Sequence, residues 1–422
     1  MIEYFNIMKI QKKSTKPSKA IWISFFWLII STPYISGILH NFARFRYIYG
    51  SIALIAVYIL IKRKKQFDNI FKNNILVFVL VGYIGLSIFW TGTIIESFKN
   101  YLVPAATLII ICLIFIEKEP DKIFITIFKR YFIVIILLSI LIEFIFRSNS
   151  TAALTAVSSH KNSFGILMAI SSIFFLWKMG KRKDNKEIGL SILFLVLSFY
   201  FLIGSRSIGA LGAFVAGSIT FLFLMFFKSK KNLKKNILII TILTFLLIVS
   251  SAKLYKSYTE YSVLQYIVEK TGRDMTFTGR TNIWDYALKT ANQPIFGYGF
   301  GGFWNEKRIL NAERSINYAA PHSHNGYLEA YLNLGLVGIT IITIILLSIS
   351  KRLIKRFVKL NNHFDILMII LFVSILFSNI FNVGLFSIYF SIEWFIFFFI
   401  AIYTKRSNKD QKKFKSIKET YK

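Results

Sequence analysis

Apolar runs of close to 20 residues recur along the whole chain and are separated by polar segments. Runs of this length are typical of helices that cross a lipid bilayer, because a helix satisfies its own backbone polar groups where water is absent. The pattern predicts an all-α polytopic membrane protein with about twelve transmembrane helices. The predicted spans are residues 20–38, 48–61, 75–90, 100–116, 130–146, 164–177, 188–204, 208–227, 237–252, 326–350, 365–382 and 384–403.

One polar segment, between the ninth and tenth spans, is much longer than the others. The spacing predicts a basic arm (1–19), nine spans (20–252), one large loop (253–325), three spans (326–403) and a basic tail (404–422). Loops of this length usually carry function. We expect short helices at Val263–Lys270 and Thr281–Asn292, the second ended by Pro294 and the glycines that follow.

The composition is typical of a membrane protein, and the cysteine count excludes two kinds of cysteine site. The chain is 55% hydrophobic and 17% aromatic, against about 45–50% apolar residues in an ordinary soluble domain. A single cysteine, Cys112, excludes a disulfide framework and a cysteine metal site. We expect no signal peptide, because no small-residue cleavage site follows the first apolar run.

The net charge of +32 predicts topology. Basic residues gather in alternate segments: the N-terminal arm, residues 62–65, 178–186, 228–235 and 351–359, and the tail. The positive-inside rule places these segments and both termini in the cytoplasm, and the large loop on the outer face of the membrane. The charge therefore indicates attraction to anionic lipid rather than nucleic-acid binding.

Two of the five histidines, His322 and His324, fall where the large loop meets the tenth span. A neutral histidine can take a proton from an attacking hydroxyl near physiological pH. Two alternatives stay open. A His-x-His pair with only Glu329 as a nearby acid is a weak metal ligand set, and either histidine can simply bond loop backbone.

Two arginines near the outer boundary are candidate anion ligands. Arg206 lies between two spans with almost no loop, where an arginine is costly and usually functional, although it can also snorkel to headgroups. Arg280 stands near a predicted helix start, where guanidinium and free N–H groups can share a phosphate. The alternative for Arg280 is a surface ion pair with Asp274 or Asp285.

Further candidates are less specific. Lys161 and its neighbours end the connection between the fifth and sixth spans at the same face, where a solvated loop is the alternative. The further candidate substrate contacts are His322, Asn325, Lys161 and Arg273. Gly209, Gly212 and Gly217 predict a helix face that allows close approach of a neighbour.

Cationic groups and a histidine base at a membrane surface fit a lipid-linked pyrophosphate donor. No Gly-rich phosphate loop and no Asp-x-Asp metal pair is present in the sequence. Arginines can instead stabilise a departing diphosphate directly.

Three segments of the sequence form recognisable motifs. They are His324-Asn325 followed after nine residues by Gly335-Leu336-Val337-Gly338, the segment 279–284 with the glycines at 297–301, and Ser205-Arg206-Ser207. They resemble, in that order, the His-Asn-x9-Gly-x-x-Gly pattern, the opening of the outer loop and the arginine segment of the O-antigen ligase and O-antigen polymerase family of bacterial envelope glycosyltransferases. The resemblance covers about residues 155–400.

The resemblance implies a helical membrane fold of the lipid-dependent (GT-C-like) glycosyltransferase type. Its donor is a glycan on undecaprenyl diphosphate at the outer face of the bacterial cytoplasmic membrane, and no cofactor or metal is expected. By position, His324 is the base for the acceptor hydroxyl, and Arg206 and Arg280 bind the donor diphosphate. His322 precedes the motif and has no assigned family role.

Polymerase and ligase share these motifs. A residue usage rich in Ile, Lys, Asn and Phe indicates an AT-rich genome, which favours polymerisation of a capsule or exopolysaccharide repeat over transfer to lipid A. Transfer to a lipid, protein or wall acceptor stays open, and so do a precursor transporter and a membrane scaffold. A transporter usually shows paired halves and ionisable residues deep in its spans, whereas Glu393 is the only acid near the middle of a predicted span. Other polysaccharide assembly proteins are candidate partners.

Overall fold

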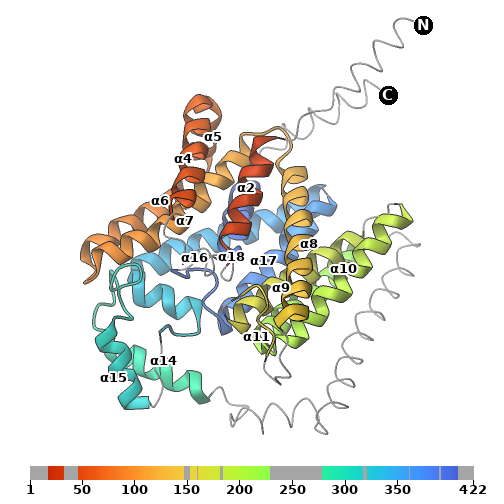
Figure 1. Ribbon diagram of the computed structural model, residues 1–422. Helices are drawn as coiled ribbons and strands as arrows, with labels where there is room; N and C mark the ends of the chain where they lie inside the picture. Colours follow the sequence, from red (N-terminus) through yellow and green to blue (C-terminus); the bar gives the residue numbers. More distant parts are fainter. Residues whose placement is uncertain are drawn as a thin grey trace, which may run out of the picture.

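The computed structural model describes residues 18–32, 46–146, 153–158, 160–180, 184–228, 278–316, 321–360, 362–388 and 391–406, and every regular element there is a helix (Figure 1). The helices are α2 (Lys19–Ile30), α4 (Arg46–Lys62), α5 (Lys64–Asn73), α6 (Ile75–Leu86), the 3-10 turn η2 (Ser87–Trp90), α7 (Ile94–Phe115), α8 (Pro120–Phe146), α9 (Lys161–Met179), α10 (Asn185–Gly204), α11 (Ile208–Lys228), α14 (Thr278–Thr290), α15 (Glu306–Ile316), α16 (Gly326–Leu360), α17 (His363–Phe381) and α18 (Ile392–Tyr403).

Seven of the helices in these residues are long and apolar enough to cross a membrane, namely α7 to α11, α16 and α17. An eighth span results if α5 and the α6–η2 segment, which meet at 88°, count as one broken span. In its described residues the structure therefore supports seven or eight of the about twelve predicted spans. The predicted spans 20–38, 48–61 and 384–403 contain shorter helices, and 237–252 lies outside the described residues.

The twelfth predicted span is wrong over its first half. Residues 384–388 form turns, and α18 begins only at Ile392, capped by the side chain of Ser391. Leu385 and Phe386 are buried, and burial among helices allows apolar, non-helical chain at this depth. Glu393 is therefore in the first turn of α18, where its carboxyl bonds the hydroxyl of Ser378 in α17.

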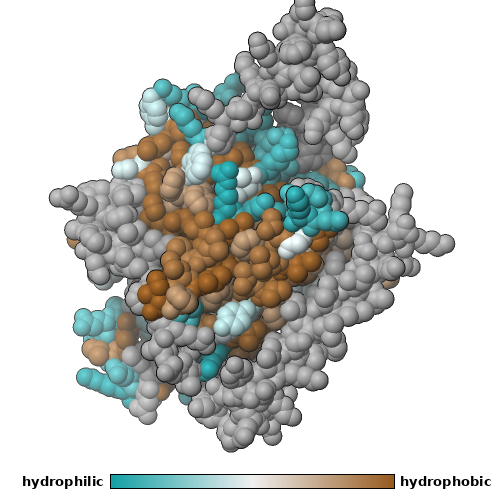
Figure 2. All heavy atoms as spheres, turned by 45° about the vertical axis from the view of Figure 1, so that its right-hand side comes forward, coloured by the Kyte–Doolittle hydropathy of each residue, from teal (hydrophilic) through white to brown (hydrophobic). Residues whose placement is uncertain are grey.

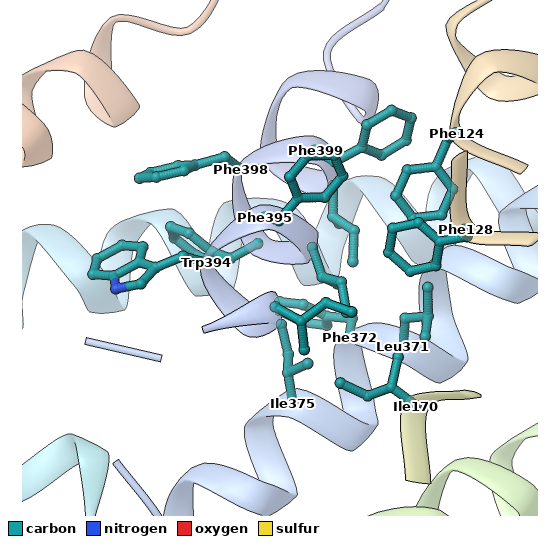
Figure 3. Close-up of a cluster of buried hydrophobic side chains, with 14 of the residues drawn as sticks. Phe124, Phe128, Ile170, Leu371, Phe372, Ile375, Trp394, Phe395, Phe398 and Phe399 are labelled. Carbon is teal, nitrogen blue, oxygen red and sulfur yellow. The ribbon is translucent and has the colours of Figure 1, made fainter. Parts of the chain in front are cut away.

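Large side chains from α8, α9, α17 and α18 form the centre of the bundle. Figure 3 shows Phe124 and Phe128 of α8 facing Phe395 and Phe399 of α18, with Ile170 of α9 and Leu371, Phe372 and Ile375 of α17 below them. The ring centroids of Phe124 and Phe399 are 4.1 Å apart. Since lipid tails are as apolar as these side chains, close packing holds the helices together here.

The outer surface of the bundle is also apolar. Figure 2 shows a broad hydrophobic area bordered by hydrophilic residues. Side chains such as Leu54, Phe89, Ile95 and Phe144 are more than two-thirds exposed. A soluble protein rarely exposes such continuous apolar surface, whereas a lipid-facing helix requires it.

The glycine face predicted on α11 is confirmed. A Cβ added at Gly209 would lie 2.8 Å from the Cβ of Phe381, and one at Gly212 would lie 2.5 Å from the ring of Phe377, both in α17. The glycines therefore bring the start of α11 against the end of α17. This contact matters because the Arg206 corner precedes α11.

Helix α16 is broken at Gly335, which has φ 62° and ψ −165°. The N–H groups of Leu336 and Val337 bond the carbonyls of Pro294 and Ile295, in the loop before α16, at 2.8 and 3.1 Å. The loop carbonyls therefore accept the hydrogen bonds that these N–H groups cannot make within the broken helix. This exchange joins the loop of residues 293–298 to the helix that follows the two histidines.

Basic residues meet at the opposite end of the bundle from His324. Arg406, after α18, donates to the carbonyl of Lys118 at 2.8 Å, and Arg63 pairs with Glu117 at 3.3 Å. Near the end of α16, Arg356 forms a buried ion pair with Asp365 at 2.9 Å. After the break at Gly335, residues 336–360 of α16 have a length of about 37 Å, so this part of α16 separates the basic end from the histidine turn.

Candidate active site

The turn before α16 holds the two predicted site histidines. His322 and His324 are partly buried, and Ser323 between them is fully buried. The backbone of His324 has φ 52°, which is uncommon for a residue other than glycine. Its N–H donates to Nδ1 of His322 at 3.3 Å, and the ring centroids are 4.1 Å apart. The turn therefore holds the two imidazoles against each other.

His322 is kept neutral by its surroundings. Burial, and after it the nearby charges of His160 and Arg280, together lower its pKa from 6.5 to about 4. His160 caps α9, accepting from the N–H of Asn162 at 3.2 Å, and Arg280 lies in α14. Three segments that are far apart in the sequence thus meet at this turn.

Helix α14 confirms the second helix predicted in the outer loop, and it connects to the histidine turn directly. The indole of Trp284 donates to the carbonyl of Ser323 at 2.8 Å. The guanidinium of Arg280 lies 5.9 Å from the ring centroid of Phe381, the last residue of α17. Asp285, one suggested partner of Arg280, pairs with Lys289 at 2.7 Å; Asp274 lies outside the described residues.

Arg206 stands exposed at the corner between α10 and α11, with φ 52°. Its neighbours Ser205 and Ser207 are buried. A Cβ added at Gly165 in α9 would lie 2.7 Å from Oγ of Ser205, and Gly209 contacts Phe381. The corner is therefore packed against the start of α9 and the end of α17, and Phe381 also lies beneath Arg280.

The remaining predicted contacts have different outcomes. Lys161 is exposed at the first residue of α9. The Oδ1 of Asn325 accepts the N–H groups of Tyr327 and Leu328, both at 3.0 Å. Asn325 is therefore the cap of α16, whereas its contact with substrate stays a prediction. Arg273 and the helix predicted at Val263–Lys270 lie outside the described residues.

Glu329 has a role at this site that the sequence analysis considered only for metal binding. Its carboxylate is 4% exposed and accepts hydrogen bonds from the backbone of Ser323 and the indole of Trp304, at 2.9 and 3.1 Å. An acid inside an apolar run is a recognised sign of function, and this sign marks Glu329 in the sequence. Its partners are not visible there, because Trp304 is 25 residues away.

Two further features bear on the chemistry. Among the residues described, no group of three or more His, Cys, Asp or Glu side chains is placed to hold a metal ion, and metal independence stays a prediction. An apolar groove of about 780 Å³ lies between η2 and residues 293–297, lined by Phe89, Trp90 and Phe296 among others. None of the predicted site residues lines it.

Comparison with known proteins finds a family model and two relatives that are similar to parts of the chain. Residues 193–343 match the family model described as O-antigen ligase, a segment that includes Arg206, Arg280 and His324. A stretch of 91 residues is 33% identical to the exopolysaccharide production protein ExoQ of Rhizobium meliloti, covering 20% of this chain and 21% of that protein.

A second relative, an uncharacterised protein of Haemophilus influenzae, is 32% identical over 158 residues, which is 35% of this chain and 38% of the relative. The chain thus matches well under two-thirds of the length of either relative. The family match confirms the resemblance drawn from the motifs around His324. The chain is a membrane protein with seven or eight candidate spanning helices in its described residues, and its residues 193–343 match the family model of the O-antigen ligases.

Proposed function

We propose that the protein is a polysaccharide polymerase. It joins oligosaccharide repeat units carried on undecaprenyl diphosphate at the outer face of the bacterial cytoplasmic membrane. The observation that carries the proposal is the meeting of the His322–His324 turn with the Arg280 helix. The Arg206 corner packs against the same end of α17, at Phe381.

The chemistry follows from the groups present. His324 takes the proton of an acceptor hydroxyl, and the oxygen attacks the anomeric carbon of the donor sugar. The bond from that carbon to the diphosphate oxygen breaks, and undecaprenyl diphosphate leaves with the electron pair. Arg280 and Arg206 neutralise the departing charge, as guanidinium groups suit bidentate phosphate contact. A single displacement inverts the anomeric configuration.

The outer location rests on charge and helix direction. The basic residues Arg63, Arg356 and Arg406 meet at the end of the bundle away from His324. By the positive-inside rule that end is cytoplasmic. The histidine turn and α14 then face outward, where a lipid-linked donor presents its glycan.

A ligase is the second candidate, because the matching family model is described as O-antigen ligase. It would transfer the same donor glycan to a lipid, protein or wall acceptor. The printed name of the relative from Rhizobium meliloti, an exopolysaccharide production protein, instead favours the polymerase. The difference lies in the acceptor, and the donor site is common to both.

The test uses purified protein with lipid-linked repeats extracted from the producing cells as the sole substrate. A polymerase converts them into a ladder of longer lipid-linked glycans, and both His324→Ala and Arg280→Ala abolish the ladder. A wild type that leaves the repeats unchanged until another acceptor is added is a ligase. Full activity in both variants contradicts the site for either reaction.

A further inference from the structure

The carboxylate of Glu329 is a buried acceptor with three N–H donors. Its Oε2 accepts the backbone N–H of Ser323 at 2.9 Å and the indole N–H of Trp304 at 3.1 Å. Its Oε1 accepts the side-chain amide of Asn333 at 3.3 Å. Because all three partners donate, an ionised carboxylate, which only accepts, satisfies them together.

These donors come from three parts of the outer region. Ser323 lies in the histidine turn, Trp304 follows the glycine-rich part of the outer loop, and Asn333 is one turn further along α16. Trp304 also packs edge-on against Phe303, with 4.9 Å between ring centroids. Glu329 therefore ties the histidine turn to the outer loop and to the helix.

Ser323 is fixed on every polar atom. Glu329 holds its N–H, and Trp284 donates to its carbonyl at 2.8 Å. Its hydroxyl donates to the carbonyl of Asn325 at 2.7 Å. The turn is thus clamped at the residue that directly precedes His324.

The clamp matters because the backbone of His324 is in a costly conformation. A φ of 52° in a residue other than glycine costs on the order of 1–3 kcal/mol and persists only where the surroundings enforce it. After His324, Asn325 is fixed as the cap of α16. Before it, the backbone is fixed through Ser323 by Glu329 and Trp284.

A buried carboxylate is also expensive in itself. Replacing buried charged groups with well-packed apolar side chains is often neutral or stabilising. In the four residues on either side of Glu329 the only other ionisable side chains are Tyr327 and Tyr331, and the segment leads into an apolar run. A carboxylate with three well-placed donors in such a segment indicates that it is retained to fix the geometry of the histidine turn.

We infer that Glu329 is a positioning residue for the base, orienting His324 through Ser323 toward the acceptor hydroxyl. The inference rests on the proposed function. Glu329 itself touches no substrate. Its removal slows the transfer step and leaves donor binding by the arginines intact.

The kinetic test compares Glu329→Gln and Trp304→Phe with wild type, and Glu313→Gln, an exposed acid on α15, is the matched control. A misplacement of about 1 Å costs on the order of 10²-fold in rate. We expect a loss of that order in kcat for Glu329→Gln and a smaller loss for Trp304→Phe, which removes one donor. The KM for the lipid-linked donor stays within roughly two-fold, as for an interaction that acts on the chemical step.

A second readout does not depend on activity. Diethyl pyrocarbonate labels exposed imidazoles, and mass spectrometry follows the peptide containing His322 and His324, with His363 as internal reference. We expect faster labelling of that peptide in Glu329→Gln and no change in Glu313→Gln. Each rate is measured on protein that is monodisperse and folded.

The outcomes separate the two proposals. Wild-type kcat in folded Glu329→Gln, a raised KM with normal kcat, or unchanged labelling each overturns the positioning role. If the wild type transfers no glycan to any acceptor, the proposed function fails and the positioning role fails with it; faster labelling then shows only that Glu329 orders the histidine turn. A lower kcat with normal KM and faster labelling supports both.

Discussion

The imidazole ring of His322 meets that of His324 edge to face, with 4.1 Å between centroids and 73° between planes. His322 accepts the backbone N–H of His324 through Nδ1. Its own proton, when the ring is neutral, is therefore on Nε2. His322 is thus a neutral imidazole that supports the turn, and His324 is the candidate base.

The neutrality of His322 predicts a pH-dependent stability. Burial, then the charges of His160 and Arg280, lower its pKa from 6.5 to about 4. The unfolded chain binds this proton near pH 6.5 and the folded chain only near pH 4. The contribution of neutral His322 to the free energy of unfolding is therefore complete above pH 6.5. It is lost as the pH drops toward 4, and the loss is roughly 3 kcal/mol at most.

Thermal unfolding of wild type and His322→Gln between pH 4 and 8 checks this contribution. The Tm of wild type minus the Tm of His322→Gln should fall as the pH drops from 6.5 toward 4, because His322 gains a proton on unfolding over this range and glutamine does not. Curves that stay parallel over this range contradict a lowered pKa for His322.

The two histidines should differ in their effect on activity. A general base contributes about 10²–10⁴-fold to a rate, so His324→Ala should lose on the order of that factor in kcat. His322→Gln keeps a polar side chain beside the turn and should lose much less. The measurement is the initial rate of glycan transfer by each variant, normalised to folded protein. A dead His322→Gln beside an active His324→Ala would reverse the assignment.

Local pattern predicted the parts of the fold that depend on residues close together. Apolar run length predicted α7 to α11, α16 and α17, and the spacing of Gly209, Gly212 and Gly217 predicted the packing of α11 on α17. Helix α14 was predicted from its start signal and the proline and glycines beyond it. Each of these features follows from side-chain type and local spacing alone.

Features that depend on distant residues were missed. Residues 384–388 are apolar and were predicted to be helical, because hydropathy reports burial and says little about backbone conformation. The bonds of Glu329 to Trp304 and of Trp284 to Ser323 join residues 25 and 39 positions apart. No local periodicity encodes such pairs, so the framework around His324 required the structure.

Arg280 should not tolerate replacement by lysine. A guanidinium binds a phosphate with two parallel hydrogen bonds, and an ammonium presents a single point charge. We expect Arg280→Lys to raise the KM for the lipid-linked donor on the order of ten-fold, and Arg280→Gln to raise it further. Arg314→Lys, on exposed α15, is the control. Equal KM values for Arg280→Lys and wild type would contradict a diphosphate contact at Arg280.

Gly335 should be essential for assembly of the outer region. Its φ of 62° and ψ of −165° fall in a region that is almost exclusive to glycine. A Cβ there would lie against the carbonyl of Ile295 and 2.5 Å from the nitrogen of Gly297. Gly335→Ala therefore forces apart the backbone bonds that join residues 294–295 to α16. We expect a loss of about 3 kcal/mol or more, since strain and lost hydrogen bonds combine.

Gly82 in α6 offers the matched substitution, because a Cβ there meets nothing within 4 Å and its backbone is helical. Alanine at this position should stabilise the helix by about 0.5–1 kcal/mol. Thermal unfolding and limited proteolysis of the two variants distinguish a requirement for glycine's backbone conformation at residue 335 from a general intolerance of added methyl groups.

If Gly335→Ala unfolds at the wild-type temperature and its outer loop resists protease equally well, the bonds between the loop and α16 do not hold the site together. If only Gly335→Ala exposes the loop, the second half of the His-Asn-x9-Gly-x-x-Gly pattern has a physical explanation. Gly335 then lets the outer loop bond into α16, close to the turn that presents His324.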